Sequence, residues 1–305
     1  MVATAVTEVT LEGKQLKLSN LSKLIWPEGL TKAHLIKYYT DIAPFLLPHI
    51  KGRPLVMKRY PHGVSGEYFY HKECPDYAPE WMQTVSIRHS KKRVNYIVCH
   101  DTATLVWLAN QGCIEMHAWL SRHPRVEYPD LAVIDLDPGR QAAFQDVLAV
   151  AEVVRQVLDY LGLLGFPKTS GAAGIHIFIP IRPVYTFREV TGAMEWLAGL
   201  VTRAVPDKAT VTRALAAREP HKVYVDYLQN TRGKSMAWTY SLRPLPGAPV
   251  STPVLWEEIE AGCIMPSDFT LNTVFCRLKE LGDLHHDMFK QAQDLSQILS
   301  LTANS

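Results

Sequence analysis

Residues 133–138 place two carboxylates in an otherwise apolar run, Val-Ile-Asp-Leu-Asp-Pro. The run predicts a buried strand, and because side chains alternate across a strand, Asp135 and Asp137 are expected on one face. Two anions at this spacing disfavour each other's ionisation and lose hydration, and a bound cation would compensate both effects. The alternative interpretation is a turn at Asp137-Pro138-Gly139, in which Asp137 caps the helix that follows.

The composition is that of an ordinary globular protein. The chain has 305 residues, of which 47% are hydrophobic and 20% are charged, and these values exclude collagenous, disordered and coiled-coil classes. No stretch is apolar enough to span a membrane, and the N-terminus lacks the features of a signal peptide. The five cysteines lie far apart without the spacing of a zinc site. We therefore expect reduced cysteines and a cytoplasmic protein.

The net charge of +2 conceals an uneven distribution. Residues 1–130 hold 16 Lys and Arg against 12 Asp and Glu, whereas residues 131–305 hold 16 against 18. A basic first half beside a carboxylate pair suits a polyanionic substrate, although a solvated surface is the commoner explanation for any single basic run. The basic residues form two clusters: Lys51, Arg53, Lys58, Arg59 and Lys72 in the first, and Arg88, Lys91, Lys92 and Arg93 in the second.

Hydrophobic periodicity and turn residues predict a mixed α/β fold. The predicted helices cover residues 31–42, 102 to about 117–119, 142–161 and 187–205, with two or three more from about residue 252 onwards. The predicted strands cover residues 55–60, 67–70, 84–88, 94–99, 133–138, 175–179, 223–228 and 236–242, the last as the neighbour of the strand before it. Residues 1–10 are expected to form a loose arm. No internal repeat or long linker is present in the sequence, so we expect a single compact domain.

A third acid in an apolar strand, Asp226, completes a possible two-metal set with Asp135 and Asp137. Two divalent ions held about 3.5–4 Å apart can activate an attacking oxygen and stabilise a leaving one in phosphoryl transfer. Carboxylate oxygens suit Mg²⁺ or Mn²⁺ better than softer metals. Taken alone, Asp226 would more often be a strand-end acid paired with a nearby base such as Arg232.

The segment Ser170-Gly171-x-x-Gly174-x-His176 supplies a complementary anion site. Glycines let backbone N–H groups approach an anion, a serine hydroxyl adds a donor, and His176 leads into the next strand. The segment is not a P-loop, because no Gly-Lys-Ser/Thr follows and the turn precedes a strand. A histidine here could also be a satisfied core residue. Arg243 ends a predicted strand, where its guanidinium could bind a phosphate or simply face solvent.

In this order, Asp135-Leu-Asp137-Pro, Ser170-Gly171-x-x-Gly174-x-His176 and Val-Asp226-Tyr resemble the archaeo-eukaryotic primase superfamily, and within it the polymerase domain of bacterial DNA ligase D. The resemblance runs from residue 18 to about 258. It implies a primase-like catalytic core with a central mixed sheet flanked by helices, within one domain over 1–305. The implied parts are an N-terminal arm (1–17), a DNA-binding lobe (18–130), a catalytic lobe (131–250) and C-terminal helices (251–305).

The resemblance also implies residue roles. The metal-binding acids are Asp135, Asp137 and Asp226, and the residues that hold the incoming nucleotide are His117, Ser170, Gly171, Gly174, His176 and Arg243. The pocket for the 5′-phosphate of the downstream strand comprises Asn20, Lys23 and Lys32, and the template surface comprises Lys58, Phe69 and Tyr70. Two positions depart from the family pattern: Ala173 stands where a lysine is common, and Gln229 where an arginine is common. Both departures bear on how strongly and selectively the nucleotide binds more than on the nucleotidyl-transfer reaction itself.

We therefore expect a nucleotidyltransferase that extends or fills DNA ends in bacterial non-homologous end joining with two Mn²⁺ or Mg²⁺ ions. The resemblance further implies a preference for ribonucleotides, and NTP or dNTP as substrates. The DNA partners would be gapped, 5′-phosphorylated or double-strand-break ends, and the protein partners Ku and a ligase near the bacterial nucleoid. Two alternatives remain open: a two-metal phosphodiesterase or nuclease, in which water attacks and no nucleotide is needed, and a non-catalytic adaptor that binds DNA ends.

Overall fold

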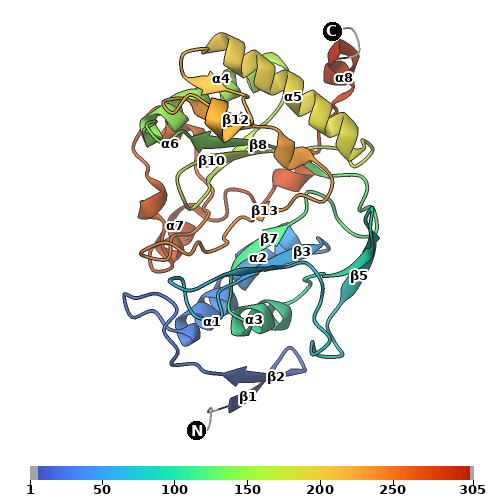
Figure 1. Ribbon diagram of the computed structural model, residues 1–305, viewed down its shortest axis with the longest axis vertical. Helices are drawn as coiled ribbons and strands as arrows, with labels where there is room; N and C mark the ends of the chain where they lie inside the picture. Colours follow the sequence, from blue (N-terminus) through green and yellow to red (C-terminus); the bar gives the residue numbers. More distant parts are fainter. Residues whose placement is uncertain (1–5, 303–305) are drawn as a thin grey trace. The chain divides into compact units, whose positions relative to one another are not determined.

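The computed structural model describes residues 6–302, and the chain forms two compact units (Figure 1). The first unit contains the chain up to Trp119 together with Ser235–Val250, and the second contains Leu120–Lys234 and the chain from Ser251 onwards. Segment 120–130 thus groups with the second unit and segment 235–250 with the first, while the expected limit between residues 250 and 251 coincides with a boundary between the units. Within the described residues, no helix is long and apolar enough to cross a membrane.

The first unit is built on a four-stranded sheet in the order β13-β7-β3-β4. Its helices are α1 (Lys32–Asp41), α2 (Ala43–Ile50) and α3 (Thr102–Asn110). The sheet strands are β3 (Leu55–Arg59), β4 (Phe69–His71), β7 (Cys113–Ala118) and β13 (Met236–Ala237), and two further hairpins pair β1 (Val6–Leu11) with β2 (Lys14–Ser19) and β5 (Thr84–Arg88) with β6 (Arg93–Ile97).

Helix α1 ties segment 235–250 to this sheet. Its apolar face is fully buried, and two tyrosines on that face still satisfy their hydroxyl groups. Tyr38 donates to the carbonyl of Tyr240 (2.8 Å), and Tyr39 donates to the carbonyl of Ile114 on β7 (2.5 Å). The sequence-distant strand β13 is therefore held beside β7.

Several predictions for the first unit were wrong. The predicted helix from residue 102 to 117–119 ends at Asn110, because Gly112 adopts φ +74° and the apolar run that follows is the buried strand β7. Strand 236–242 was expected beside 223–228 but pairs with β7. Residues 6–10 of the expected arm form β1, and residues 1–5 lie outside the described part. Arg53, assigned to a basic surface, is fully buried, and it donates to His49 and Trp119 carbonyls.

The second unit is built on a five-stranded sheet in the order β11-β12-β8-β10-β9. Its strands are β8 (Leu131–Pro138), β9 (Phe166–Thr169), β10 (Ile175–Pro180), β11 (Ala209–Thr210) and β12 (Val223–Asp226). Its helices are α4 (Phe144–Tyr160), α5 (Phe187–Ala204), α6 (Trp256–Glu260), α7 (Val274–Leu281) and α8 (Ser296–Thr302).

Helices α4 and α5 cover one face of this sheet (Figure 1). Ile134 and Leu136 of β8 belong to the same buried apolar cluster as Val154 of α4 and Leu197 of α5. Asp135 and Asp137 alternate with these residues along β8 and therefore occupy the opposite face. Because the helices cover one face of the sheet, the acids lie on the other. The two acids share this face, as the alternation of side chains along the strand predicted.

Candidate functional site

Four polar side chains form one row across the sheet of the second unit. Asp226 on β12 lies opposite Asp135 on β8, Asp135 lies opposite His176 on β10, and His176 lies opposite Lys168 on β9. Directly opposed residues of antiparallel strands have Cβ atoms about 4.5–5.5 Å apart on the same face. Strand register therefore brings two of the predicted acids and the predicted histidine together.

The acids differ in their surroundings. Asp135 is buried, and its Oδ1 lies 3.4 Å from His176 Nε2, whereas Asp137 is exposed near the end of β8. Asp226 is half-buried; its Oδ1 accepts from Leu228 N (2.8 Å) and its Oδ2 from Gln229 Nε2 (3.2 Å). In residues 6–302 no three His, Cys, Asp or Glu side chains form a ready-made metal cluster. The donor set fits a hard cation in chemistry, but Asp226 would have to leave these local bonds to join it.

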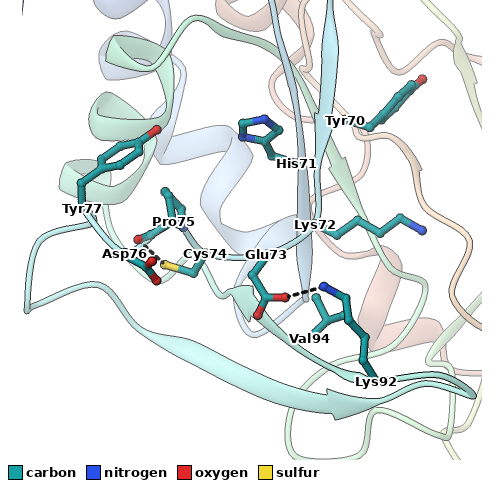
Figure 2. Close-up of a pocket in the computed structure, with 10 residues that line it drawn as sticks. All are labelled: Tyr70, His71, Lys72, Glu73, Cys74, Pro75, Asp76, Tyr77, Lys92 and Val94. Atoms are coloured by element: carbon teal, nitrogen blue, oxygen red, sulfur yellow. Dashed lines mark hydrogen bonds and ion pairs between the residues drawn. The ribbon is translucent and has the colours of Figure 1, made fainter.

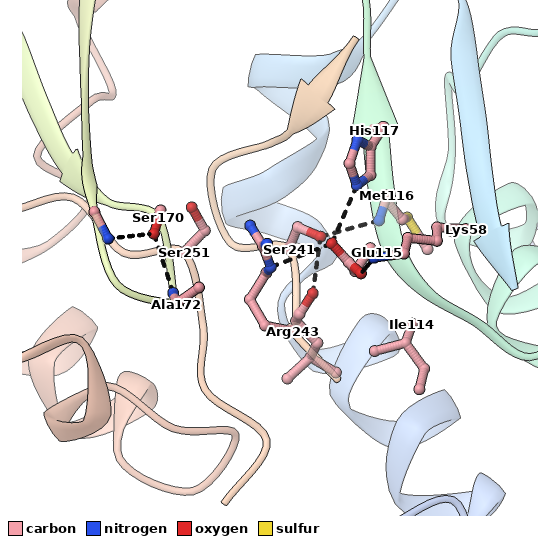
Figure 3. Close-up of polar contacts among 12 residues, drawn as sticks. Lys58, Ile114, Glu115, Met116, His117, Ser170, Ala172, Ser241, Arg243 and Ser251 are labelled. Carbon is pink, nitrogen blue, oxygen red and sulfur yellow. Dashed lines mark hydrogen bonds and ion pairs between the residues drawn. The ribbon is translucent and has the colours of Figure 1, made fainter. Parts of the chain in front are cut away.

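The glycine turn is held by Ser170. Its Oγ accepts from the backbone N–H groups of Ala172 (3.1 Å) and Gly174 (3.0 Å) (Figure 3), so these two donors serve the turn itself. Gly171 adopts φ +71°, and a Cβ on Gly174 would overlap the carbonyl oxygen of Leu136 on β8. Both glycines are therefore required by backbone conformation and close packing. The turn places Ser170, which is buried, and His176 in one short segment of the sheet.

In the first unit, Glu115 on β7 is a fully buried carboxylate with four donors around it. Its Oε1 accepts from Lys58 Nζ (2.5 Å) and Tyr60 OH (2.9 Å), and its Oε2 lies 3.2 Å from His117 Nε2 and from Arg243 Nε (Figure 3). Burial by itself would raise the pKa of Glu115. The hydrogen bonds from His117 and Lys58 and the charge of Arg243 outweigh burial and lower the pKa to about 2.

Glu115 thus gathers three residues that the sequence assigned to substrate binding. Lys58 and Glu115 are cross-strand neighbours on β3 and β7, and His117 lies two residues along β7 on the same face. The hydroxyl of Ser241 accepts from Met116 N (2.9 Å), which anchors the segment that carries Arg243. Sequence reasoning missed Glu115, because Lys58, Tyr60 and Arg243 come to it from parts of the chain far away in the sequence.

The predicted template surface divides between two faces of β4. Lys58 Nζ lies 4.6 Å from the ring of Tyr68 and 5.6 Å from the ring of Tyr70. These two rings make an edge contact, and both are more than half exposed. Phe69 is also exposed, but as the residue between them it faces the other side of the strand, in register with Arg59. Tyr68, which was missed, therefore joins Lys58 and Tyr70, whereas Phe69 does not.

The three residues predicted for the 5′-phosphate pocket do come together. Asn20, Lys23 and Lys32 line one cavity of about 200 Å³, to which Arg59 contributes a third cation and no acid contributes. Lys23 Nζ donates to the carbonyl of Pro61 (2.5 Å). Burial, followed by the charges of Lys23 and Arg59, lowers the pKa of Lys32 to about 8. A small cavity with three cations is chemically suited to a phosphate group.

A second cavity of the first unit, of about 660 Å³, lies between β4 and the β5–β6 hairpin. Tyr77 and His71 line one part of it, and Glu73, which receives a 3.2 Å bond from Lys92, lines another (Figure 2). Arg59 donates to the hydroxyl of Tyr77 (3.1 Å), so this cavity and the cation pocket share a hydrogen-bonded neighbour.

Comparisons with known proteins place these features in a family. Over residues 31–285 the chain matches the family described as LigD, primase-polymerase domain. It is 34% identical over 289 residues to the bifunctional non-homologous end joining protein LigD of Bacillus subtilis, and 32% identical over 274 residues to the multifunctional LigD of Mycolicibacterium smegmatis. These alignments cover 93% and 89% of this chain but only 46% and 36% of those proteins.

A solved structure, the polymerase domain of Mycobacterium tuberculosis ligase D in complex with DNA, is similar over 91% of this chain and 99% of that domain. The TM-score is 0.85 at 30% sequence identity. The mixed α/β, primase-like fold expected from the sequence is thereby confirmed.

Proposed function

This chain belongs to the LigD primase-polymerase domain family, and from this premise we propose that it is a nucleotidyltransferase that extends or fills DNA ends during non-homologous end joining. The observation that carries the proposal is the cross-sheet row of Asp226, Asp135 and His176, next to the Ser170 turn. The row combines hard-metal ligands with donors for an anion on one face of one sheet.

In this proposal Asp135, Asp137 and Asp226 hold Mg²⁺ or Mn²⁺, as one ion or two. When bound, the metal would stabilise the charge that develops on phosphate oxygens during nucleotidyl transfer. Asp135 is fixed by its neighbours on β8, β10 and β12, whereas Asp226 gives up its bonds to Leu228 and Gln229 to turn towards the row. Asp137 is exposed near the end of β8.

For the nucleotide we propose Ser170 and His176 in the second unit. In the first unit we propose, separately, His117 and Arg243 as groups that can bind a phosphate. His176 can donate a hydrogen bond to a phosphate oxygen, and Gly171 and Gly174 shape the turn that carries Ser170. Arg243 faces Glu115 through its Nε, and a guanidinium group can bind phosphate through two parallel bonds. A preference for ribonucleotides is part of the proposal.

For DNA we propose that the cavity of Asn20, Lys23, Lys32 and Arg59 binds the 5′-phosphate of the downstream strand. Lys58 with Tyr68 and Tyr70 offers a cation and two exposed rings to the template, and aromatic faces stack on unpaired bases of any sequence. We further propose cooperation with Ku and a DNA ligase in the bacterial cytoplasm.

The test is extension of a labelled primer on 5′-phosphorylated gapped DNA with Mn²⁺ and either ribo- or deoxynucleoside triphosphates. The Asp135→Ala variant is assayed in parallel. We expect growth of the primer, faster with ribonucleotides and absent in the variant. Shortening of the primer without nucleotide would identify a nuclease instead, and binding with no change in length would identify a DNA-end adaptor.

A further inference from the structure

The cross-sheet row of the second unit ends in Lys168, a residue that the proposed chemistry does not use. Lys168 is fully buried, and on β9 it lies directly opposite His176 on β10. Burying an ammonium group is strongly unfavourable unless its donors are hydrogen-bonded. The contacts of Lys168 therefore show what the buried charge is bound to.

The direction of these hydrogen bonds follows from the donor inventory. Lys168 Nζ lies 2.9 Å from His176 Nδ1 and also contacts Ser251 Oγ. The Ser251 hydroxyl donates its own proton to the carbonyl of Thr169 (2.8 Å), so Ser251 accepts from Lys168. An ammonium group has three donors and no acceptor, so His176 Nδ1 accepts as well.

The ring of Phe178 completes the environment of the cation. Its centroid lies 5.2 Å from Lys168 Nζ, within the range of a cation–π contact. Phe178 and His176 lie two residues apart on β10, and therefore on the same face of the sheet. The buried ammonium is thus placed by side chains of β10 and by Ser251.

An accepting Nδ1 determines where His176 carries its proton. A neutral imidazole has one N–H group, and with Nδ1 as acceptor that group is Nε2–H. His176 Nε2 lies on the acidic side of the ring, 3.4 Å from Asp135 Oδ1. In this tautomer the ring proton therefore points towards Asp135, the part of the row proposed to hold the metal ion that would engage the phosphates of the nucleotide.

We infer that Lys168 is a positioning residue, which holds His176 in the Nε2–H tautomer so that this nitrogen donates to the phosphates of the incoming nucleotide. The identity of the ligand rests on the proposed function, whereas the tautomer follows from the contacts of Lys168 alone. Lys168 lies on β9 opposite His176, whereas the exposed position 173 of the glycine turn is an alanine.

The first measurement is the tautomer of His176 in the full chain labelled with ¹⁵N-histidine. Its signals are assigned by their loss in His176→Gln. We expect a bare Nδ1 and a protonated Nε2 in the unsubstituted protein and in Lys168→Arg, and a mixture of tautomers in Lys168→Met. Lys208→Met, which removes an exposed lysine of the same unit, should leave the signals unchanged. An unchanged Nε2–H tautomer in folded Lys168→Met overturns the inference.

The second measurement separates positioning from structural support. In Lys168→Met the KM for the nucleoside triphosphate should rise about tenfold, the effect of one lost charge-assisted hydrogen bond, with a smaller change in kcat. Lys168→Arg should recover most of this loss. Equal losses of kcat in both variants without a change in KM would overturn the inference.

Ser251→Ala keeps the test decisive if Lys168→Met does not fold. This small change removes one acceptor of Lys168 and should shift the His176 tautomer in the same direction, with a smaller rise in KM; no shift counts against the inference. If the unsubstituted protein neither binds nucleotide nor extends primers while the tautomer still responds to Lys168, the proposed function fails and the positioning of His176 stands.

Discussion

The two units hold charge in opposite ways. In the first, one buried carboxylate, Glu115, gathers the cations Lys58 and Arg243 together with His117. In the second, two acids share a row with a buried cation, Lys168, and a histidine separates acid from base. The first arrangement suits binding of phosphates already present, and the second suits a site where a metal ion must be bound.

Because of this difference, substitutions in the first unit should mainly affect stability, and substitutions in the second should mainly affect activity. The first unit's carboxylate is completely enclosed, so its removal leaves uncompensated cations in the fold and should be costly for stability. The acids of the second unit include one exposed and one half-buried side chain, so their removal should cost activity more than stability.

The largest effect should come from the acidic row. Asp135→Asn and Asp226→Asn should each lower the rate of primer extension by about 100-fold or more, because in the proposed function each removes a carboxylate that would hold the metal ion. DNA affinity should change little. Steady-state extension and a binding titration measure the two effects, and Asp159→Asn, an exposed acid of α4, is the matched control. Extension at the normal rate in either variant would remove the row from the site.

The next effect concerns the stability of the first unit. Glu115→Ala should lower the free energy of unfolding by about 3–5 kcal/mol, the usual cost of breaking a buried ion pair from one side. Asp41→Ala, which removes an exposed partner of Lys37, should cost less than about 1 kcal/mol. Denaturant titration measures both. Equal costs in the two variants would contradict the contrast between a buried and an exposed carboxylate.

The pH dependence of that stability has a definite sign. The pKa of Glu115 is lowered from 4.5 to about 2 in the fold, so its contribution is present above pH 4.5 and is lost as the pH falls towards 2. The stability difference between the unsubstituted protein and Glu115→Ala should therefore shrink over this interval. A difference that stays constant over this interval would show that these contacts do not lower the pKa of Glu115.

Sequence reasoning located the acids and both long helices because their signals are local. Asp135 stands out within its own strand, and α4 and α5 carry helical periodicity over four turns or more. It missed Lys168 and Glu115 because their significance lies in cross-strand register, which links residues far apart in the sequence. The Gly112 break before β7 was the one local signal that could have placed Glu115 and His117 on a strand.

The N-terminal hairpin and the correct membership of the template surface were also missed, although each has a local signal in the sequence. Residues 6–11 carry apolar side chains at Val6, Val9 and Leu11 between polar ones, and Glu12 and Gly13, both at positive φ, form the two-residue turn that joins β1 to β2. Phe69 and Tyr70 were grouped because the resemblance implied a template-binding role for both, but adjacent strand residues face opposite sides. Tyr68 would have followed from applying that rule.

A smaller effect tests the cation pocket of the first unit. The pKa of Lys32 is lowered to about 8, so the fraction of charged Lys32 falls as the pH rises through 8. The preference for 5′-phosphorylated over 5′-hydroxyl gapped DNA should then weaken by several-fold, up to about tenfold, between pH 7 and pH 9. Lys32→Arg, which stays charged, should keep a constant preference. The ratio of the two dissociation constants at each pH measures the effect, and a constant ratio in the unsubstituted protein would exclude Lys32 from phosphate binding.

The smallest expected effect is a difference between the two units in how strongly their lysines contribute to the salt dependence of DNA affinity. Lys23→Ala should reduce the slope of log affinity for 5′-phosphorylated DNA against log salt concentration by about 1, because one phosphate contact and its released counterion are lost. Lys208→Ala, which removes an exposed lysine of the second unit, should leave the slope unchanged, because no DNA contact is assigned to it. Binding titrations at several salt concentrations measure both slopes. Equal changes would mean that DNA senses the overall charge of the protein, whereas a change confined to Lys23 would assign phosphate binding to the cation pocket of the first unit.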